Sequence, residues 1–178
     1  MIHSDDLTQA QRQIDEAWMR LALEEADKAA AIGEVPIGAV LVKDGQLIAS
    51  AFNLRERDHA ATAHAELLVI QEANRLVGAW RLTGSTLYVT VEPCPMCSGA
   101  IILSRVDRVV YGTTDPKAGC AGSLMNLVED SRFNHRVELV AGVLEEECRQ
   151  KMKDFFQGLR LRNKARKQAN QAADKDAQ

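Results

Sequence analysis

The residues best suited to chemistry are Cys94 and Cys97, which are separated by two residues, and the His64-Ala65-Glu66 triplet that precedes them. Zinc in proteins takes four ligands in a tetrahedron, and two thiolates with the His64 imidazole would supply three of them. No fourth cysteine or histidine lies at ligand spacing. Three protein ligands leave one position for water, which is typical of a catalytic zinc rather than a structural one. We therefore predict one zinc ion per chain, with Glu66 beside the open position as the proton carrier.

Each half of this pattern has a plainer interpretation, since a C-x-x-C pair can be a redox pair and H-x-E is common by chance. Pro93 and Pro95 flank the first cysteine, and a strand-like run comes just before it. These neighbours favour the metal interpretation. The joint pattern H-x-E…P-C-x-x-C is the known signature of zinc-dependent nucleobase deaminases.

The composition favours one globular domain with a full core, because the 178 residues are 46% hydrophobic and 26% charged. With two of the four cysteines assigned to metal, no disulfide framework remains, and this fits a reducing cytoplasm. Residues 1–13 lack the apolar run of a signal peptide, and no segment approaches membrane-spanning length. We expect a cytoplasmic protein with no membrane partner and no DNA partner.

The net charge of −3 is unevenly distributed along the chain. Residues 1–150 carry 14 basic and 22 acidic side chains, whereas residues 151–178 carry 8 basic and 3 acidic ones. A basic end on an acidic body indicates a polyanionic partner at that end. The alternative is a solvated helix end, which composition alone favours.

The elements that position these residues can be predicted from periodicity. Residues from Ile14 onward repeat at helical spacing until Gly33. The apolar runs 38–43 and 46–53 flank Asp44-Gly45, which predicts an antiparallel hairpin. Thr62 is a candidate N-cap for a helix that ends near Leu76, with His64 and Glu66 in its first turn.

A third strand at 86–91 leads into Cys94, and a helix should follow as far as Leu103. Two helix N-termini would then meet at one zinc, where the helix dipole favours thiolates. Further strands are predicted at 108–111 and 136–140, and a closing helix from Leu144 onward. The predicted fold is a three-layer α/β/α sandwich with a mixed five-stranded sheet. The expected divisions are a polar, frayed extension at 1–14, a zinc deaminase domain at 15–162, and a largely disordered tail at 163–178.

From about Trp18 to Phe156 the chain resembles the bacterial tRNA-specific adenosine deaminases of the cytidine-deaminase-like superfamily. The zinc core alone would also fit cytosine, cytidine or guanine deaminases, so the flanking stretches carry the resemblance to the tRNA enzymes. They are Gly33 to Val40, Thr62 to Glu66, Thr86 to Thr90, Glu92 to Cys94, Cys97, Gly99-Ala100, Ser104-Arg105, Asp115, Lys117, Gly122 to Leu124, Asn134 to Glu138 and Phe155-Phe156.

The resemblance implies a homodimer that converts the wobble adenosine in the anticodon arm of an arginine tRNA to inosine. The nucleotide must be splayed out of its stack to reach such a site. The resemblance also implies substrate roles for several residues. Asn53 would hydrogen-bond the target nucleotide, and Val35 and Pro36 would line the base pocket. Asp115 would lie near the neighbouring sugar, and Phe156 would contact the RNA. Phosphates would be held by Arg160, Arg162, Lys164, Arg166 and Lys167.

Each of these assignments has a structural alternative. Asn53 could be a strand-end turn residue, at least one of Phe155 and Phe156 is expected to pack in the core, and Cys120 and Cys148 are expected to be free buried thiols. Two other functions remain open. A deaminase of a free base or nucleoside would not need the basic helix, and a structural zinc or RNA-binding module would not need Glu66.

Overall fold

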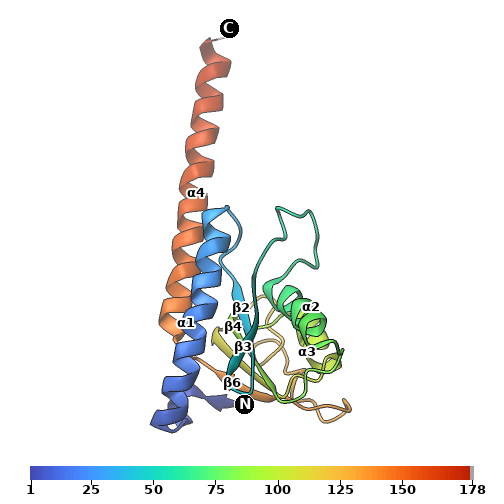
Figure 1. Cartoon of the computed structure of the whole chain (residues 1–178). Coiled ribbons are helices and arrows are strands. Elements are labelled where there is room, and N and C mark those ends of the chain that lie inside the picture. The colour runs from blue at the N-terminus through green and yellow to red at the C-terminus, as the bar shows by residue number, and fades with distance from the viewer. Residues whose placement is uncertain (177–178) are drawn as a thin grey trace.

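The computed structural model describes the backbone of residues 1–176 and the side chains of residues 1–171. One six-stranded sheet has the strand order β1-β6-β5-β4-β2-β3. Helices α1 and α4 cover one face of this sheet and α2 and α3 cover the other, so the molecule has three layers (Figure 1). The elements are β1 (Ile2–His3), a 3₁₀ turn (Ser4–Asp6), α1 (Gln9–Ala31), β2 (Gly38–Lys43), β3 (Gln46–Phe52), α2 (Ala65–Val77), β4 (Ser85–Val91), α3 (Pro95–Leu103), β5 (Arg108–Thr113), β6 (Glu138–Ala141) and α4 (Glu145–Asp176). The predicted three-layer mixed sheet is confirmed.

The hairpin β2–β3 forms as predicted, with Gly38 opposite Phe52 and Lys43 opposite Gln46. Asp44 and Gly45 both have positive φ, 51° and 71°. That is the conformation a two-residue turn needs if its twist is to match that of the strands, and Asp-Gly adopts it readily.

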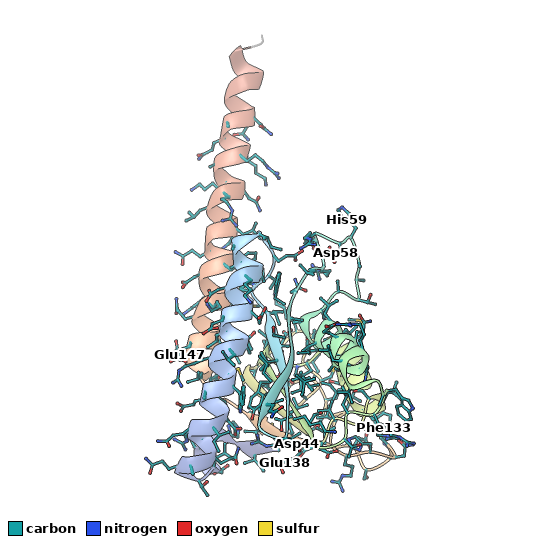
Figure 2. All side chains as sticks on the ribbon, viewed as in Figure 1. Asp44, Asp58, His59, Phe133, Glu138 and Glu147 are labelled. Atoms are coloured by element: carbon teal, nitrogen blue, oxygen red, sulfur yellow. The ribbon has the colours of Figure 1, made fainter. Side chains whose placement is uncertain are left out.

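Strand directions define a functional end of the sheet. Strand β4 is parallel to β5, and β5 is parallel to β6, while β2 is antiparallel to both β3 and β4. Strands β3, β4 and β5 therefore all finish at the same end, which we call the site end. Asp44 and Glu138 lie at the opposite end (Figure 2). Ligands of open α/β sheets bind beyond the carboxyl ends of the strands, and this rule points to the site end.

Alternating residues of the central strands fill two separate cores. Leu87, Val89 and Val109 pack with α2 and α3. Tyr88 and Val110, which alternate with them along the strands, point to the other face and pack with α1 and with Cys148 of α4. Because both faces of the sheet are covered, β2, β4 and β5 are buried along almost their whole length. Burial on both faces fixes the strand register, and the register in turn fixes where the loops at the site end begin.

The predicted strand count was wrong, because the N-terminus adds a sixth strand. Ile2 and His3 pair in parallel with Val140 and Ala141 of β6. This two-residue strand is held by its backbone, so no side-chain pattern marks it in the sequence. The segment expected to be frayed thus lies against the sheet edge.

Two helices begin at residues other than those predicted. Helix α1 starts at Gln9 rather than near Ile14, because the Thr8 side chain accepts a hydrogen bond from the Gln11 N–H at 3.2 Å. A Thr-x-x-Gln sequence is a capping signal, and it precedes the apolar periodicity by several residues. Helix α2 starts at Ala65, and its N-cap is His64 rather than Thr62.

Helix α4 continues to Asp176, where a tail without regular structure was expected. Alanine, glutamine, lysine and arginine all have high helix propensity, which explains why a polar sequence continues the helix. Strand β6 is also displaced from the prediction, covering Glu138–Ala141 instead of 136–140. None of the described helices, α4 included, combines the length and apolar character that a bilayer crossing requires.

A buried ion pair that the sequence did not reveal joins α1 to the sheet. Asp15 is fully buried and accepts two hydrogen bonds of 2.7 Å from the Arg108 guanidinium, which also bonds Glu138. The Tyr88 hydroxyl donates to the same carboxylate at 2.9 Å, and burial raises the pKa of Tyr88. Removal of Asp15 would leave the Arg108 charge and the Tyr88 hydroxyl without their buried acceptor.

We therefore expect Asp15→Ala to lower the free energy of unfolding by about 3–5 kcal/mol. The matched control is Glu16→Ala, which removes only a partly exposed pair with Arg20 on the same helix and should cost less than about 1 kcal/mol. Urea denaturation of both variants measures the difference. Equal losses in the two variants would contradict a stabilising role for the Asp15–Arg108 pair.

Candidate metal centre

The chain directions bring the sequence-predicted residues to the site end from several elements. Asn53 follows β3 directly, Cys94 follows β4 by three residues, and Asp115 follows β5 by two. Val35 and Pro36 precede β2, which runs in the opposite direction and therefore starts at this end. The Asn53 N–H donates to the Ile37 carbonyl at 2.9 Å, so the entry to β2 and the exit from β3 are in direct contact.

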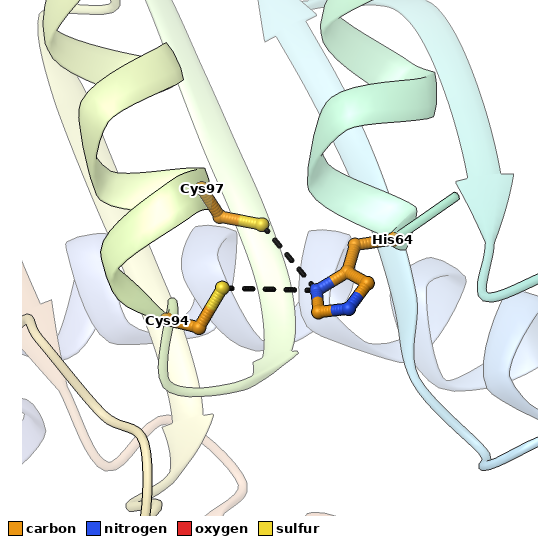
Figure 3. Close-up of side chains that lie close together, drawn as sticks. All are labelled: His64, Cys94 and Cys97. Atoms are coloured by element: carbon orange, nitrogen blue, oxygen red, sulfur yellow. Dashed lines mark hydrogen bonds between the residues drawn. The ribbon is translucent and has the colours of Figure 1, made fainter. Parts of the chain in front are cut away.

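His64, Cys94 and Cys97 converge because two helices start beside each other (Figure 3). His64 is the N-cap of α2, Cys94 is the N-cap of α3, and Cys97 lies in the first turn of α3. His64 Nδ1 lies 3.7 Å from the Cys94 sulfur and 3.6 Å from the Cys97 sulfur. In the part of the chain that the structure describes, these three residues form the one group able to hold a metal ion.

The spacing of these atoms fits zinc. A tetrahedral ion with Zn–S bonds of about 2.3 Å and a Zn–N bond of about 2.0 Å places its sulfur and nitrogen ligands about 3.6 Å apart. The two measured separations of 3.6 and 3.7 Å match that value. The His/Cys/Cys donor set is also one that zinc prefers, and as a three-residue set it leaves a fourth position open.

The two cysteines differ in how readily they lose a proton. A hydrogen bond from the Cys97 thiol lowers the pKa of Cys94 to about 4, and the same interaction raises the pKa of Cys97. The hydrogen bond with Cys94 in turn raises the pKa of His64. Cysteine binds zinc as the thiolate, so metal binding at this pair would release the proton between the two sulfurs.

Glu66 lies in the first turn of α2, two residues after His64, and its side chain is buried. Burial is the largest cause of a raised pKa for this carboxyl group, and the Cys94 thiolate raises it further. Hydrogen bonding by the Cys97 thiol acts in the opposite direction. A carboxyl group with a raised pKa can both accept and donate a proton near neutral pH.

Asn53 is buried and its orientation is fixed by Glu34, a residue to which sequence reasoning gave no role of its own. Asn53 Nδ2 donates to the Glu34 carboxylate at 2.9 Å, and the Arg57 backbone N–H donates to the other carboxylate oxygen at 2.6 Å. Because a carboxylate can only accept, the Asn53 amide nitrogen must face Glu34. The Asn53 side-chain oxygen is then the atom that can accept a hydrogen bond from a ligand.

Asp115 and Lys117 lie on a loop that crosses the site end after β5. Asp115 Oδ1 accepts hydrogen bonds from the backbone N–H groups of Lys117 at 2.9 Å and Ala118 at 3.3 Å. One oxygen of the Asp115 carboxylate therefore stabilises the turn formed by residues 115–118. Lys117 is exposed, so its ammonium group is accessible to an anion.

Phe156 and Arg160 do not join this cluster, because α4 lies on the other face of the sheet. Phe155 is half-buried and lines a groove of about 980 Å³ between α1 and α4, together with Arg162. Phe156 meets Phe155 edge to face, with 5.4 Å between the ring centroids, and remains 38% exposed. Arg160 is exposed on α4.

Comparison with known proteins gives consistent results. Residues 14–160 match the family model of the MafB19-like deaminases. The chain is 59% identical over 151 residues to a tRNA-specific adenosine deaminase of Bacillus subtilis, covering 85% of this chain and 94% of the relative. It is 45% identical over 163 residues to a tRNA-specific adenosine deaminase of Haemophilus influenzae, covering 91% and 94%. A solved structure from work on A-to-I editing by tRNA:A34 deaminases at the wobble position superposes with a TM-score of 0.73 at 42% identity, covering 76% of this chain and 98% of that one.

Proposed function

Because this chain belongs to the MafB19-like deaminase family, and within it to the tRNA-specific adenosine deaminases, we propose that it converts adenosine to inosine in tRNA by hydrolysis. The proposed target is the wobble adenosine of an arginine tRNA. The observation that carries this proposal is the convergence of His64, Cys94 and Cys97 beside the buried carboxyl group of Glu66. A structural zinc module has no use for such a carboxyl group.

The three ligands would hold one zinc ion through His64 Nδ1 and the two cysteine sulfurs. Zinc supplies Lewis acidity, which lowers the pKa of a coordinated water from about 15.7 towards about 7. The donor set and its spacing support this assignment, and the N-terminal ends of α2 and α3 favour the thiolate form of the cysteines.

Glu66 is the proton carrier of the proposed reaction. Its carboxylate takes the proton of the attacking water and delivers it to N1 of the adenine ring, while the water oxygen adds to C6. It then takes the proton of the hydroxyl group now on C6 and delivers it to the amino group, so that the C6–N bond breaks, ammonia leaves and C6 becomes the carbonyl carbon of inosine. Burial supports this role, because it raises the pKa of Glu66 above its ordinary value.

The walls of the base pocket would come from the loop before β2 and from the end of β3. Pro36 is buried and Val35 is half-buried, which suits an apolar surface against a purine ring. The Asn53 side-chain oxygen, held in place by Glu34, would accept a hydrogen bond from the target nucleotide. Asp115 would face the sugar of the neighbouring nucleotide.

The basic part of α4 is suited to hold the anticodon arm. This helix extends past the domain at the same end as Asp58 and His59, which mark the loop between β3 and α2 (Figure 2). Arg160, Lys164 and Lys167 are spaced i, i+4, i+7 and share one side of the helix. Arg162 and Arg166 are rotated by about 200° from that side. A single phosphate backbone can lie along only one of these two sides.

Neutralising the two sides separately therefore tests the role of α4. The triple change Arg160→Gln, Lys164→Gln, Lys167→Gln and the double change Arg162→Gln, Arg166→Gln both keep high helix propensity. The side that contacts phosphates should lose tRNA affinity, and its log–log salt slope should fall by roughly 0.7 to 0.9 for each contact removed. Filter binding over a salt series measures both quantities. Unchanged slopes in both variants would mean that the basic side chains of α4 are only a solvated helix end.

The proposal includes a homodimer. Four large apolar side chains are exposed on α3 and on the loop between β5 and β6. They are Leu103, Leu124, Met125 and Phe133. Exposed apolar groups of this size suit a second subunit, and sedimentation velocity over a concentration series would detect or refute it.

The proposed function is tested by incubating the purified protein with an arginine tRNA transcript and, separately, with free adenosine, guanine, cytosine and cytidine. Inosine at the wobble position of the transcript, without turnover of the free compounds, is the expected result. A transcript with guanosine at the wobble position is the control and should yield no inosine. Turnover of a free base or nucleoside with an unchanged transcript would identify the rival enzyme class instead.

A further inference from the structure

A buried carboxylate that has no part in the reaction above lies immediately before the metal-binding turn. Glu92 is 3% exposed and follows β4, two residues before Cys94. Its oxygens face the loop after β5 rather than the metal cluster. Oε1 accepts from the Ala121 N–H at 3.0 Å and the Ser123 N–H at 2.8 Å. Oε2 accepts from the Asp115 N–H at 3.0 Å and from the Ser123 hydroxyl.

These four donors use the hydrogen-bonding capacity of both carboxylate oxygens. They come from residues at both ends of the segment 115–123, so one side chain fixes the whole loop. The loop also bonds the metal-binding turn through its backbone, since the Cys120 N–H donates to the Pro93 carbonyl at 2.8 Å. Glu92 thus connects the turn that carries Cys94 to the loop that carries Asp115 and Lys117.

Gly119, within the loop, packs directly against the Glu92 carboxylate. A Cβ atom added to Gly119 would overlap the Glu92 carboxylate and the Asp115 carbonyl. The φ angle of Gly119 is not positive, so the reason for glycine here is space rather than backbone conformation. The loop therefore closes on Glu92 with no room for a side chain between them.

We infer that Glu92 is a positioning residue for RNA binding, which holds the loop 115–123 across the site end so that Asp115 and Lys117 face the strand next to the target nucleotide. This inference rests on the proposed function. Glu92 acts through the loop and does not touch the reacting atoms. Its loss should therefore raise KM for tRNA and leave the zinc content and the kcat of the bound substrate nearly unchanged.

Glu92→Gln is the sharpest variant, because an amide nitrogen cannot accept from a backbone N–H. The Ser123 hydroxyl can rotate to accept from the new amide, whereas the Asp115 N–H cannot, and so the Asp115 end of the loop is released. We expect amide hydrogen exchange in segment 115–123 to accelerate by about tenfold or more, and KM for tRNA to rise by about tenfold. Ser123→Ala removes one donor only and should shift both quantities less, in the same direction. Glu24→Gln, an exposed change on α1, is the control.

A double-mutant cycle with Asp115→Ala identifies the route by which Glu92 acts. If Glu92 works through the loop, Asp115→Ala should add little to the KM of Glu92→Gln, because the two effects share one cause.

Wild-type exchange and wild-type KM in both Glu92→Gln and Ser123→Ala would overturn the inference. Loss of zinc from Glu92→Gln would also overturn it, since Glu92 would then support the Cys94 turn instead. If the wild-type protein forms no inosine, the proposed function fails, and the role in RNA binding fails with it. The exchange data would then test only the Glu92–loop contact.

Discussion

Glu66→Gln is expected to keep the metal and the fold while lowering kcat by about 10²–10⁴-fold. The amide has nearly the shape of the carboxylate, so the packing at the start of α2 should persist. It cannot take a proton from water or pass one to the purine. Metal analysis and single-turnover inosine formation, measured on the same sample, separate the two properties.

The control for this variant is Glu72→Gln, which lies on the same helix but is exposed and pairs only with Arg75. Its turnover should equal that of the wild type. Near-normal turnover in Glu66→Gln would end the assignment of Glu66 as proton carrier. Loss of metal in Glu66→Gln would instead give this residue a structural part in the metal centre.

Cys94→Ala and Cys97→Ala are expected to lose zinc and to lose roughly 10³-fold or more in turnover, because two remaining protein ligands hold the ion poorly. Cys148→Ala is the matched control. Cys148 is a thiol as buried as that of Cys97, but it belongs to the core on the α1 and α4 side of the sheet. It should retain one zinc per chain even though its stability falls. Stoichiometric zinc in Cys94→Ala or Cys97→Ala would show that the ligand set is misassigned.

The convergence of His64, Cys94 and Cys97 could be predicted because their spacing and their place at helix starts are local properties. The same holds for the hairpin at Asp44-Gly45 and for the strands β2, β4 and β5, whose sequences are mostly apolar or β-branched. The short strand β1 could not be predicted, since two residues have no periodicity and its pairing partner is 138 residues away.

Buried carboxylates are the other group that the sequence concealed. Asp15, Glu34 and Glu92 look like surface residues in a chain rich in acidic side chains, and only tertiary structure shows which donors surround them. Asp15 receives its partner from β5, Glu34 from the loop after β3, and Glu92 from the loop after β5. The end of α4 differs from the prediction for another reason, because its polar composition is also that of a disordered tail, while its residues have high helix propensity.

The central claim is that one metal ion, held by His64, Cys94 and Cys97, is required for deamination of tRNA. The most direct test removes the metal with a chelator and titrates zinc back while inosine formation is followed. We expect that activity is lost with the metal, rises in proportion to added zinc, and reaches a plateau at one zinc per chain. Full activity in the metal-free protein, or a plateau at two zinc ions per chain, would contradict it.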